Sequence, residues 1–197
     1  FHAETAAKVF HVARADVTPE MRRQAKAVNF GIVYGISAFS LSQDIGSTVA
    51  EAKAYMDAYF ATFPGVRKYM DDVVEKAKET GYVETLFHRR RDLPELTSSN
   101  HNLRAFGERV ALNMPIQGTA ADIMKLAMAA VARRLQAERP DARLVLQVHD
   151  ELIVECPAAE AEAVARLLEE EMENVVHLSV PLTAQAHWGK NWLEAKG

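Results

Sequence analysis

A single β-rich segment interrupts a chain whose pattern is otherwise mostly helical, and this segment constrains the fold most strongly. Residues 144–156 read LVLQVHDELIVEC, two apolar runs that meet at His149-Asp150. Apolar, β-branched runs joined by a two-residue polar turn predict an antiparallel hairpin, and His and Asp tolerate positive φ better than most residues. We therefore expect an α+β fold in which helices dominate and a small antiparallel sheet holds the hairpin 144–156.

Start and stop signals predict the helices on either side of this segment. Thr18-Pro19 indicates a helix start, because threonine caps the first turn and proline suits the first helical position. Pro115 is expected to break a later helix, and the capping-box spacing of Thr119 and Asp122 is expected to restart it. The expected helices cover about 4–11, 18–34, 38–45, 48–63, 66–80, 100–114, 119–135 and 158–174, with an extended region at 82–94 and a weak last strand at 180–186.

Composition excludes several classes of protein. Of the 197 residues 49% are hydrophobic and the net charge is only -4, so the chain can bury a core and is not disordered. No apolar run approaches the ~20 residues that span a bilayer, and no signal peptide pattern opens the sequence. Cys156 is the only cysteine, which excludes an internal disulfide and a Cys-x-x-Cys zinc site. We expect a soluble, cytosolic chain of one large or two small domains.

The acidity of the chain is concentrated in one segment. Residues 155–173 carry seven glutamates and one arginine, so the rest of the chain has a net positive charge. Its basic residues cluster at 14–26 and at 89–109. Charge runs of this kind are commonly solvated faces, but they can also hold phosphates.

The helix expected at 18–34 presents a stripe of cations and aromatic rings. At about 100° per residue, Arg22, Lys26, Phe30 and Tyr34 wind slowly along one side, with Arg23 beside them. Two cations one turn apart suit a di- or triphosphate, and the rings can stack on a base or sugar. An ordinary surface helix fits the same periodicity. The opposite, apolar face consists of Ala25, Val28, Ile32 and Ile36.

Two glycines lie at the end of this helix. Gly31 and Gly35 each lower helix stability by roughly 1 kcal/mol relative to alanine. Their presence therefore indicates a close approach or a bend at this point. Periodicity alone leaves both the binding and the surface-helix interpretations open.

Asp150 and Glu151 are adjacent acids at the expected tip of the hairpin. Aspartate is common in turns for local reasons alone. A carboxylate at a strand end also offers hard oxygen ligands to Mg²⁺, and phosphoryl transfer between nucleotides generally uses two such ions. A metal-dependent phosphohydrolase of the His-Asp type is a weaker alternative, since the seven histidines form no ligand spacing.

Several segments resemble, in the same order, the motifs of family A DNA polymerases of the bacterial DNA polymerase I type. RRQAKAVNFGIVYG resembles the nucleotide-binding helix of the fingers subdomain, placed here at about 18–35. The resemblance implies that Arg22 and Lys26 contact the triphosphate of the incoming nucleotide, and that His2 lies near its β-phosphate. It also implies that Phe30 packs near the sugar and base and that Tyr34 sits at the templating position.

LVLQVHDELIVE resembles the third polymerase motif of the family. By this resemblance Asp150 is a metal ligand, Glu151 a supporting acid and His149 a contact to the primer end. The implied cofactor is Mg²⁺, with two ions in the complete enzyme. Asp150, Glu151 and Lys26 are then the catalytic residues.

NMPIQGTAAD resembles the palm helix that follows the minor groove of the duplex. The amides of Asn113 and Gln117 suit the acceptors that all base pairs share there. Arg104 and Arg109 are expected to contact the primer-template DNA as well. YVETLFHRRRDLPEL resembles the arginine-rich segment after the fingers, with His88 where glycine is usual, and GKNWLEAK resembles the C-terminal end of the family.

The resemblance implies a fingers subdomain at 1–95 and the C-terminal part of a palm at 96–197. The family's pattern for its first metal-binding aspartate does not occur in the chain, so we expect a truncated sequence that is inactive alone. Within a longer chain, the implied function is template-directed DNA synthesis, the nucleotidyl transfer from a dNTP to a primer 3′-OH.

The implied partners are primer-template DNA, deoxynucleoside triphosphates and the missing N-terminal part of the same polymerase, with no membrane partner. The implied location is the bacterial cytoplasm, in association with the nucleoid, and the implied processes are DNA replication and repair. A non-catalytic DNA-binding module derived from a polymerase is the alternative.

Overall fold

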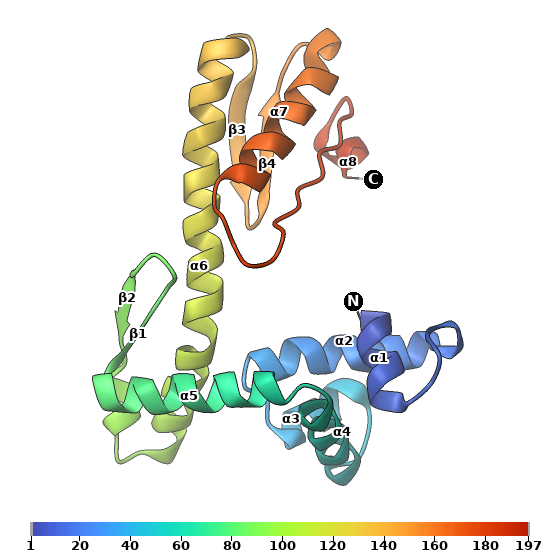
Figure 1. The fold of residues 1–197 in the computed structure, drawn as a ribbon, viewed down its shortest axis with the longest axis vertical. Helices are drawn as coiled ribbons and strands as arrows, with labels where there is room; N and C mark the ends of the chain where they lie inside the picture. Colours follow the sequence, from blue (N-terminus) through green and yellow to red (C-terminus); the bar gives the residue numbers. More distant parts are fainter. Residues whose placement is uncertain (1, 197) are drawn as a thin grey trace. The chain divides into compact units, whose positions relative to one another are not determined.

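The structure, a computed structural model, describes residues 2–196 of the chain. The chain divides into two compact units, Phe1–Ile116 and Gln117–Gly197. The long helix α6 (His101–Glu138) crosses this division (Figure 1). The boundary expected between residues 95 and 96 is a functional one and stays a prediction.

The first unit opens with a run of short α-helices, α1 (His2–Phe10), α2 (Pro19–Val33), α3 (Ala38–Ile45), α4 (Val49–Thr62) and α5 (Pro64–Thr80). Their starts carry the signals read from the sequence. The Met21 amide donates to Thr18 Oγ1 (3.1 Å), and Pro19 is the first residue of α2. Thr48 and Glu51 form a reciprocal capping box at the start of α4. These contacts satisfy backbone amides that a helix start leaves without partners.

The apolar faces of α1 to α4 pack into one core. Val28 and Ile32 of α2 are 0% and 1% exposed, and Leu41 of α3 is fully buried. Phe10 and Tyr55 meet edge to face with ring centroids 5.1 Å apart. Burial of each large apolar side chain is worth about 1.5–3 kcal/mol, so one face of α2 is held firmly against its neighbours. The other face of α2 is left to solvent.

A second cluster joins α5 to a two-stranded antiparallel sheet, β1 (Tyr82–Glu84) and β2 (Arg90–Asp92). Gly81 ends α5 at φ 80, and the Leu93 amide donates to its carbonyl (2.8 Å). Val83, Leu93 and Ala111 are buried together, so this sheet packs on the first part of α6. A short 3₁₀ helix, Pro94–Thr97, leads into α6.

The second unit is built on the hairpin of β3 (Arg143–Val148) and β4 (Glu151–Glu155), which confirms the hairpin predicted at 144–156. The strands pair antiparallel, with a register irregularity between Leu144 and Leu146. Val131 of α6 and Val164 of α7 (Ala161–Asn174) pack in its core. A final short helix, α8 (Trp192–Ala195), closes the described chain.

The acidic helix predicted at 158–174 is α7, and one cation neutralises part of its charge. Arg134 of α6 forms ion pairs with Glu170 and Glu171 of α7 at 2.8 and 3.0 Å, and with Glu138 at 3.0 Å. Hydrogen bonds to these carboxylates raise the pKa of Arg134 above its usual range. This cluster ties α6 to α7.

The predicted break near Pro115 is wrong, because α6 is continuous over 38 residues with Pro115 inside it. A proline there costs about 3 kcal/mol or more. Residues on both sides of it, Leu112 and Thr119 among them, are buried, and burial of this kind can offset the cost. The predicted capping box at Thr119 and Asp122 is also wrong, since both lie buried within the helix. In the described part of the chain, no helix is both long and apolar enough to cross a membrane.

The weak strand predicted at 180–186 is not a strand in the structure. Side chains of α7 take up its backbone amides instead of a neighbouring strand. Glu173 accepts from the Ala184 amide (2.9 Å), and Glu169 accepts from the Ala186 amide (2.8 Å). The segment is therefore an extended strap fixed to α7.

Candidate functional site

Arg22 and Lys26 lie one turn apart on the exposed side of α2. Neither side chain forms a hydrogen bond or ion pair with any residue in 2–196. Arg23 is different, because it pairs with Glu20 (2.6 Å) and also donates to the carbonyl oxygen of Ile45 (3.3 Å). Arg22 and Lys26 thus present uncompensated charge, whereas Arg23 links α2 to α3.

Phe30 and Tyr34 continue the stripe toward the end of α2. Their exposed fractions are 50% and 36%, which is high for large aromatic side chains on a helix whose other face is fully packed. Exposed rings offer flat surfaces on which a base or sugar can stack. The sequence-predicted stripe of Arg22, Lys26, Phe30 and Tyr34 is therefore a solvent-facing surface.

His2 joins this stripe from α1. Its ring lies 5.7 Å from the Phe30 ring, tilted by 46°. Burial lowers the pKa of His2, and the positive charges of Arg22 and Lys26 lower it further. His2 of α1 therefore lies beside Phe30 of α2 and close enough to Arg22 and Lys26 for their charges to affect its pKa.

Asn29 is a residue of this site that the periodicity missed. It is 6% exposed, and its Nδ2 lies 3.0 Å from His2 Nδ1 and 3.1 Å from Thr5 Oγ1. The available signal was a polar residue that directly follows Val28 at the margin of the apolar face. Its partners could not be found from α2 alone, because they lie on α1.

Both glycines of α2 and its following turn lie at close approaches, as the sequence predicts. A Cβ on Gly31 would lie 2.8 Å from Ile36 Cγ2. Gly35 has φ +70, and a Cβ there would lie 3.1 Å from Leu112 Cδ1 of α6. Glycine therefore allows the chain to turn sharply directly after Tyr34.

The second candidate site is the tip of the β3-β4 hairpin. His149 adopts φ 52, and Gln147 Nε2 donates to its carbonyl oxygen (2.8 Å). Asp150 is exposed, and its carboxylate bonds to no residue in the described range. Glu151 is half-buried at the start of β4, opposite Val148. The turn holds two carboxylates at the edge of a packed sheet.

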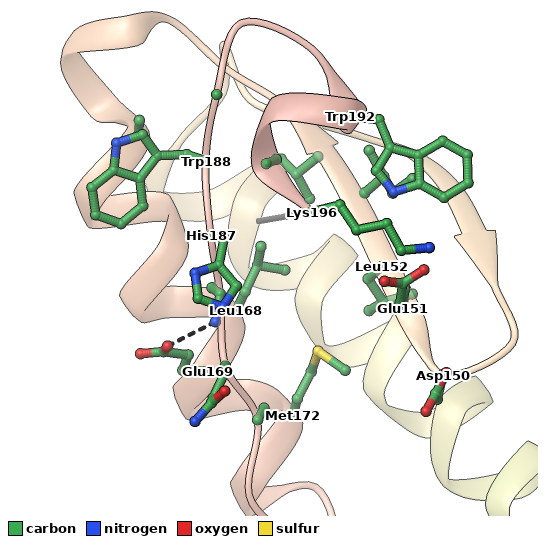
Figure 2. Close-up of a pocket in the computed structure, with 18 of the residues that line it drawn as sticks. Asp150, Glu151, Leu152, Leu168, Glu169, Met172, His187, Trp188, Trp192 and Lys196 are labelled. Atoms are coloured by element: carbon green, nitrogen blue, oxygen red, sulfur yellow. Dashed lines mark hydrogen bonds between the residues drawn. The ribbon is translucent and has the colours of Figure 1, made fainter. Parts of the chain in front are cut away.

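A cavity of about 1390 Å³ lies beside these acids in the second unit. It is lined by β4, by α7 and by residues 182–196 (Figure 2). Leu152, Leu168 and Met172 supply apolar walls, and Asp150 and Glu151 contribute carboxylates. The hairpin acids thus adjoin an open, largely apolar hollow.

The acids at the hairpin tip fit a magnesium site in part. Carboxylate oxygens are the ligands that Mg²⁺ prefers, and it is usually held by one or two carboxylates plus water and substrate phosphates. Asp150 and Glu151 supply two such groups. Within residues 2–196, however, no three His, Cys, Asp or Glu side chains come together to hold a metal ion.

The polar residues predicted to contact DNA are spread along α6. Arg104 donates to the carbonyl oxygens of Ser98 (2.7 Å) and Ser99 (3.0 Å), so part of its guanidinium braces the preceding loop. Arg109 and Gln117 are exposed. Asn113 is half-buried, and its Oδ1 has no hydrogen-bond partner within the described chain.

The model of the family described as DNA polymerase family A matches residues 1–194. The chain therefore belongs to DNA polymerase family A, which confirms the resemblance read from the sequence.

Individual relatives agree with this assignment. The chain is 56% identical to DNA polymerase I of Geobacillus stearothermophilus and 55% identical to that of Bacillus subtilis (strain 168), each over 195 residues. These matches cover 99% of this chain but only 22% of either relative.

A solved structure titled as the POL domain of Pol1 from M. smegmatis, in complex with DNA primer-template and dNTP, is 44% identical with a TM-score of 0.95. The match covers 100% of this chain and 35% of the chain in the solved structure.

Proposed function

We propose that this chain is part of a DNA-directed DNA polymerase and acts in template-directed transfer of a nucleotide from a dNTP to a primer 3′-OH. The observation that carries the proposal is the pair Arg22 and Lys26, one turn apart and without a hydrogen-bond or ion-pair partner among the described residues, beside exposed Phe30. Family membership supports it, and so does the structural relative, whose title names primer-template DNA and dNTP.

In this proposal the first unit binds the incoming nucleotide. Arg22 and Lys26 hold the triphosphate, and Lys26 also stabilises the charge that develops on it during transfer. His2 donates a hydrogen bond to a phosphate oxygen. Phe30 packs near the sugar and base, and Tyr34 occupies the templating position.

The hairpin tip carries the other catalytic groups. The primer 3′-OH gives up its proton to solvent as its oxygen attacks the α-phosphorus of the dNTP, the bond to the β-phosphate oxygen breaks, and pyrophosphate leaves. Asp150 would hold Mg²⁺, with Glu151 as a supporting acid, and the ion when bound would activate the primer oxygen and neutralise the leaving group. His149, exposed beside them, contacts the primer end.

The duplex is held by residues along α6. Arg109 and the exposed part of Arg104 neutralise backbone phosphates, while Asn113 and Gln117 test the minor-groove acceptors that correctly paired bases share. Residues 1–95 then act as fingers and 96–197 as the C-terminal part of the palm. The remainder of the polymerase supplies the missing metal ligand, and the protein works in the bacterial cytoplasm at the nucleoid.

The test is Asp150→Ala in the full-length polymerase, with Glu155→Ala as the matched control at the far end of the same strand pair. Primer extension with Mg²⁺ should be lost in Asp150→Ala and retained in Glu155→Ala. Both variants should bind primer-template DNA like wild type in fluorescence anisotropy. Unimpaired extension by Asp150→Ala contradicts the catalytic assignment. A wild-type chain that binds DNA but never extends a primer supports the non-catalytic module instead.

A further inference from the structure

Asn29 is a buried amide in contact with the histidine of the stripe. Its Nδ2 lies within hydrogen-bond distance of His2 Nδ1 (3.0 Å) and Thr5 Oγ1 (3.1 Å). Its Oδ1 is buried without a hydrogen-bond partner in the described part of the chain. An unsatisfied buried carbonyl oxygen is costly. The two hydrogen bonds of Nδ2 must therefore outweigh this cost for the amide to keep its orientation.

The orientation of this amide follows from its partners. Nδ2 carries two N–H groups and meets two atoms that can accept, His2 Nδ1 and Thr5 Oγ1. The flipped amide would leave two buried N–H groups without acceptors in place of one carbonyl oxygen. Asn29 therefore donates to His2 Nδ1, which must be unprotonated. The single ring proton of the neutral imidazole then sits on Nε2.

We propose that Asn29 is a positioning residue that holds His2 in the Nε2–H tautomer and so presents a donor, not an acceptor, to the nucleotide phosphate. The N–H bond of Nε2 points away from the lone pair of Nδ1 and hence away from Asn29. The Phe30 ring at 5.7 Å restricts how the imidazole can turn. The inference rests on the proposed nucleotide site, because only an anion beside Arg22 and Lys26 makes a fixed donor useful.

Thr5 anchors the amide without touching the reacting groups. It is 3% exposed on α1 and accepts the second N–H of Asn29. The Thr5→Val variant removes that bond but leaves the bond between Asn29 and His2 in place. It is therefore a control for loss of buried hydrogen bonding at the same junction of α1 and α2.

The first test is a double-mutant cycle in the full-length polymerase with primer-template DNA. Asn29→Leu should raise the KM for dNTP roughly tenfold, the size expected for one misdirected hydrogen bond to a charged group. In the His2→Ala background the same substitution should change KM less than about twofold, because a positioning residue acts through its partner. Equal effects in both backgrounds overturn the proposal. Thr5→Val should leave KM near the wild-type value.

The second test reads the tautomer directly, by ¹⁵N NMR of histidine-labelled protein without nucleotide. Wild type should show His2 protonated at Nε2 only. The nearly isosteric Asn29→Asp offers only acceptors, so the proton should move to Nδ1 or occupy both nitrogens. An Nδ1–H tautomer in wild type, or an unchanged tautomer in Asn29→Asp, overturns the proposal. A KM insensitive to Lys26→Ala, by contrast, contradicts the nucleotide site itself and leaves this readout intact.

Discussion

The pKa of His2 depends on its burial and on the positive charges around it. Burial lowers this pKa first, and the charges of Arg22 and Lys26 lower it further. The unfolded chain therefore binds the proton more readily than the folded one. The contribution of His2 to the free energy of unfolding is complete at a pH above the ordinary pKa of histidine. It is lost as the pH falls through the lowered pKa of the folded chain.

We predict that Lys26→Ala raises the pKa of His2 toward its ordinary value, because one repelling charge is removed. The shift should be partial, since burial is the larger cause. An NMR titration of the His2 ring measures it. Lys53→Ala, which removes a lysine paired with Asp57 on α4, should leave the His2 titration unchanged. A pKa of His2 that falls or stays constant in Lys26→Ala contradicts the described geometry.

His88 is a residue whose backbone is strained. It lies in the turn between β1 and β2 at φ 61, a region that costs residues with a Cβ about 1–2 kcal/mol and glycine almost nothing. We predict that His88→Gly is neutral or mildly stabilising and that His88→Val destabilises by about 1–2 kcal/mol. Urea unfolding of the two variants gives the comparison. Equal stability of His88→Val and His88→Gly is the result that rules out strain at this turn.

At the residue scale, the sequence is sufficient for some site residues and not for others. Arg22, Lys26, Phe30 and Tyr34 can be placed together because helix geometry fixes the spacing within one element. The role of Asn29 could not be predicted, because its partners lie 24 and 27 residues away on another helix. The pairing of Arg23 with Glu20 is local to α2, but its further hydrogen bonds to carbonyl groups at the end of α3 could not be predicted from α2 alone.

At the scale of elements, the starts of helices could be predicted from the sequence, but the continuity of α6 through Pro115 could not. The caps at Thr18 and Thr48 are local, so the sequence contains all of their partners. Pro115 lies inside a continuous helix, and the burial of residues on either side of it is not visible in the local sequence. The segment 180–186 likewise has strand-like residues, but glutamates of α7 take up two of its amides.

The turn after α2 gives a prediction for an element. Gly31→Ala gains helix propensity, yet its Cβ would lie 2.8 Å from Ile36 Cγ2, so we expect a loss of about 1–3 kcal/mol in unfolding free energy. Gly65→Ala in the first turn of α5 is the control, because nothing lies within 4 Å of its added Cβ. That control should be neutral or stabilising by up to about 1 kcal/mol. Thermal or urea unfolding distinguishes them, and a stabilised Gly31→Ala contradicts the close approach.

At the scale of the whole molecule, the sequence predicts the family and the α+β class but not the division into units. That division falls between Ile116 and Gln117, inside a continuous helix. Pro115 marks this point in the sequence, but there it predicts a break in the helix and not a boundary between units. The family motifs, by contrast, are short and local, so they can be recognised without knowledge of the packing.

The incomplete metal site gives a prediction for the whole molecule. Asp150 and Glu151 find no third ligand residue within 2–196, and the chain spans 22% of its curated relatives. We expect the 197-residue chain alone, given Mg²⁺, primer-template DNA and all four dNTPs, to extend no primer, while the full-length polymerase does. Gel-based primer extension measures both. Template-directed extension by the short chain would show that the remaining ligands are dispensable.

The measurement that bears most directly on the central assignment is single-nucleotide incorporation by full-length Lys26→Ala, Arg22→Ala and Arg23→Ala polymerases over a range of dNTP concentrations. Arg22 and Lys26 pair with no other residue in the part of the chain that the structure describes, so their removal should lower kcat/KM for dNTP by roughly a hundredfold or more, as expected for loss of a charged contact to phosphate. Arg23 is occupied by Glu20, so Arg23→Ala should retain kcat/KM within about threefold of wild type and show a lower melting temperature instead. A loss of kcat/KM in Arg23→Ala as large as in the other two, or no loss in any of them, contradicts the assignment of this stripe as the nucleotide site.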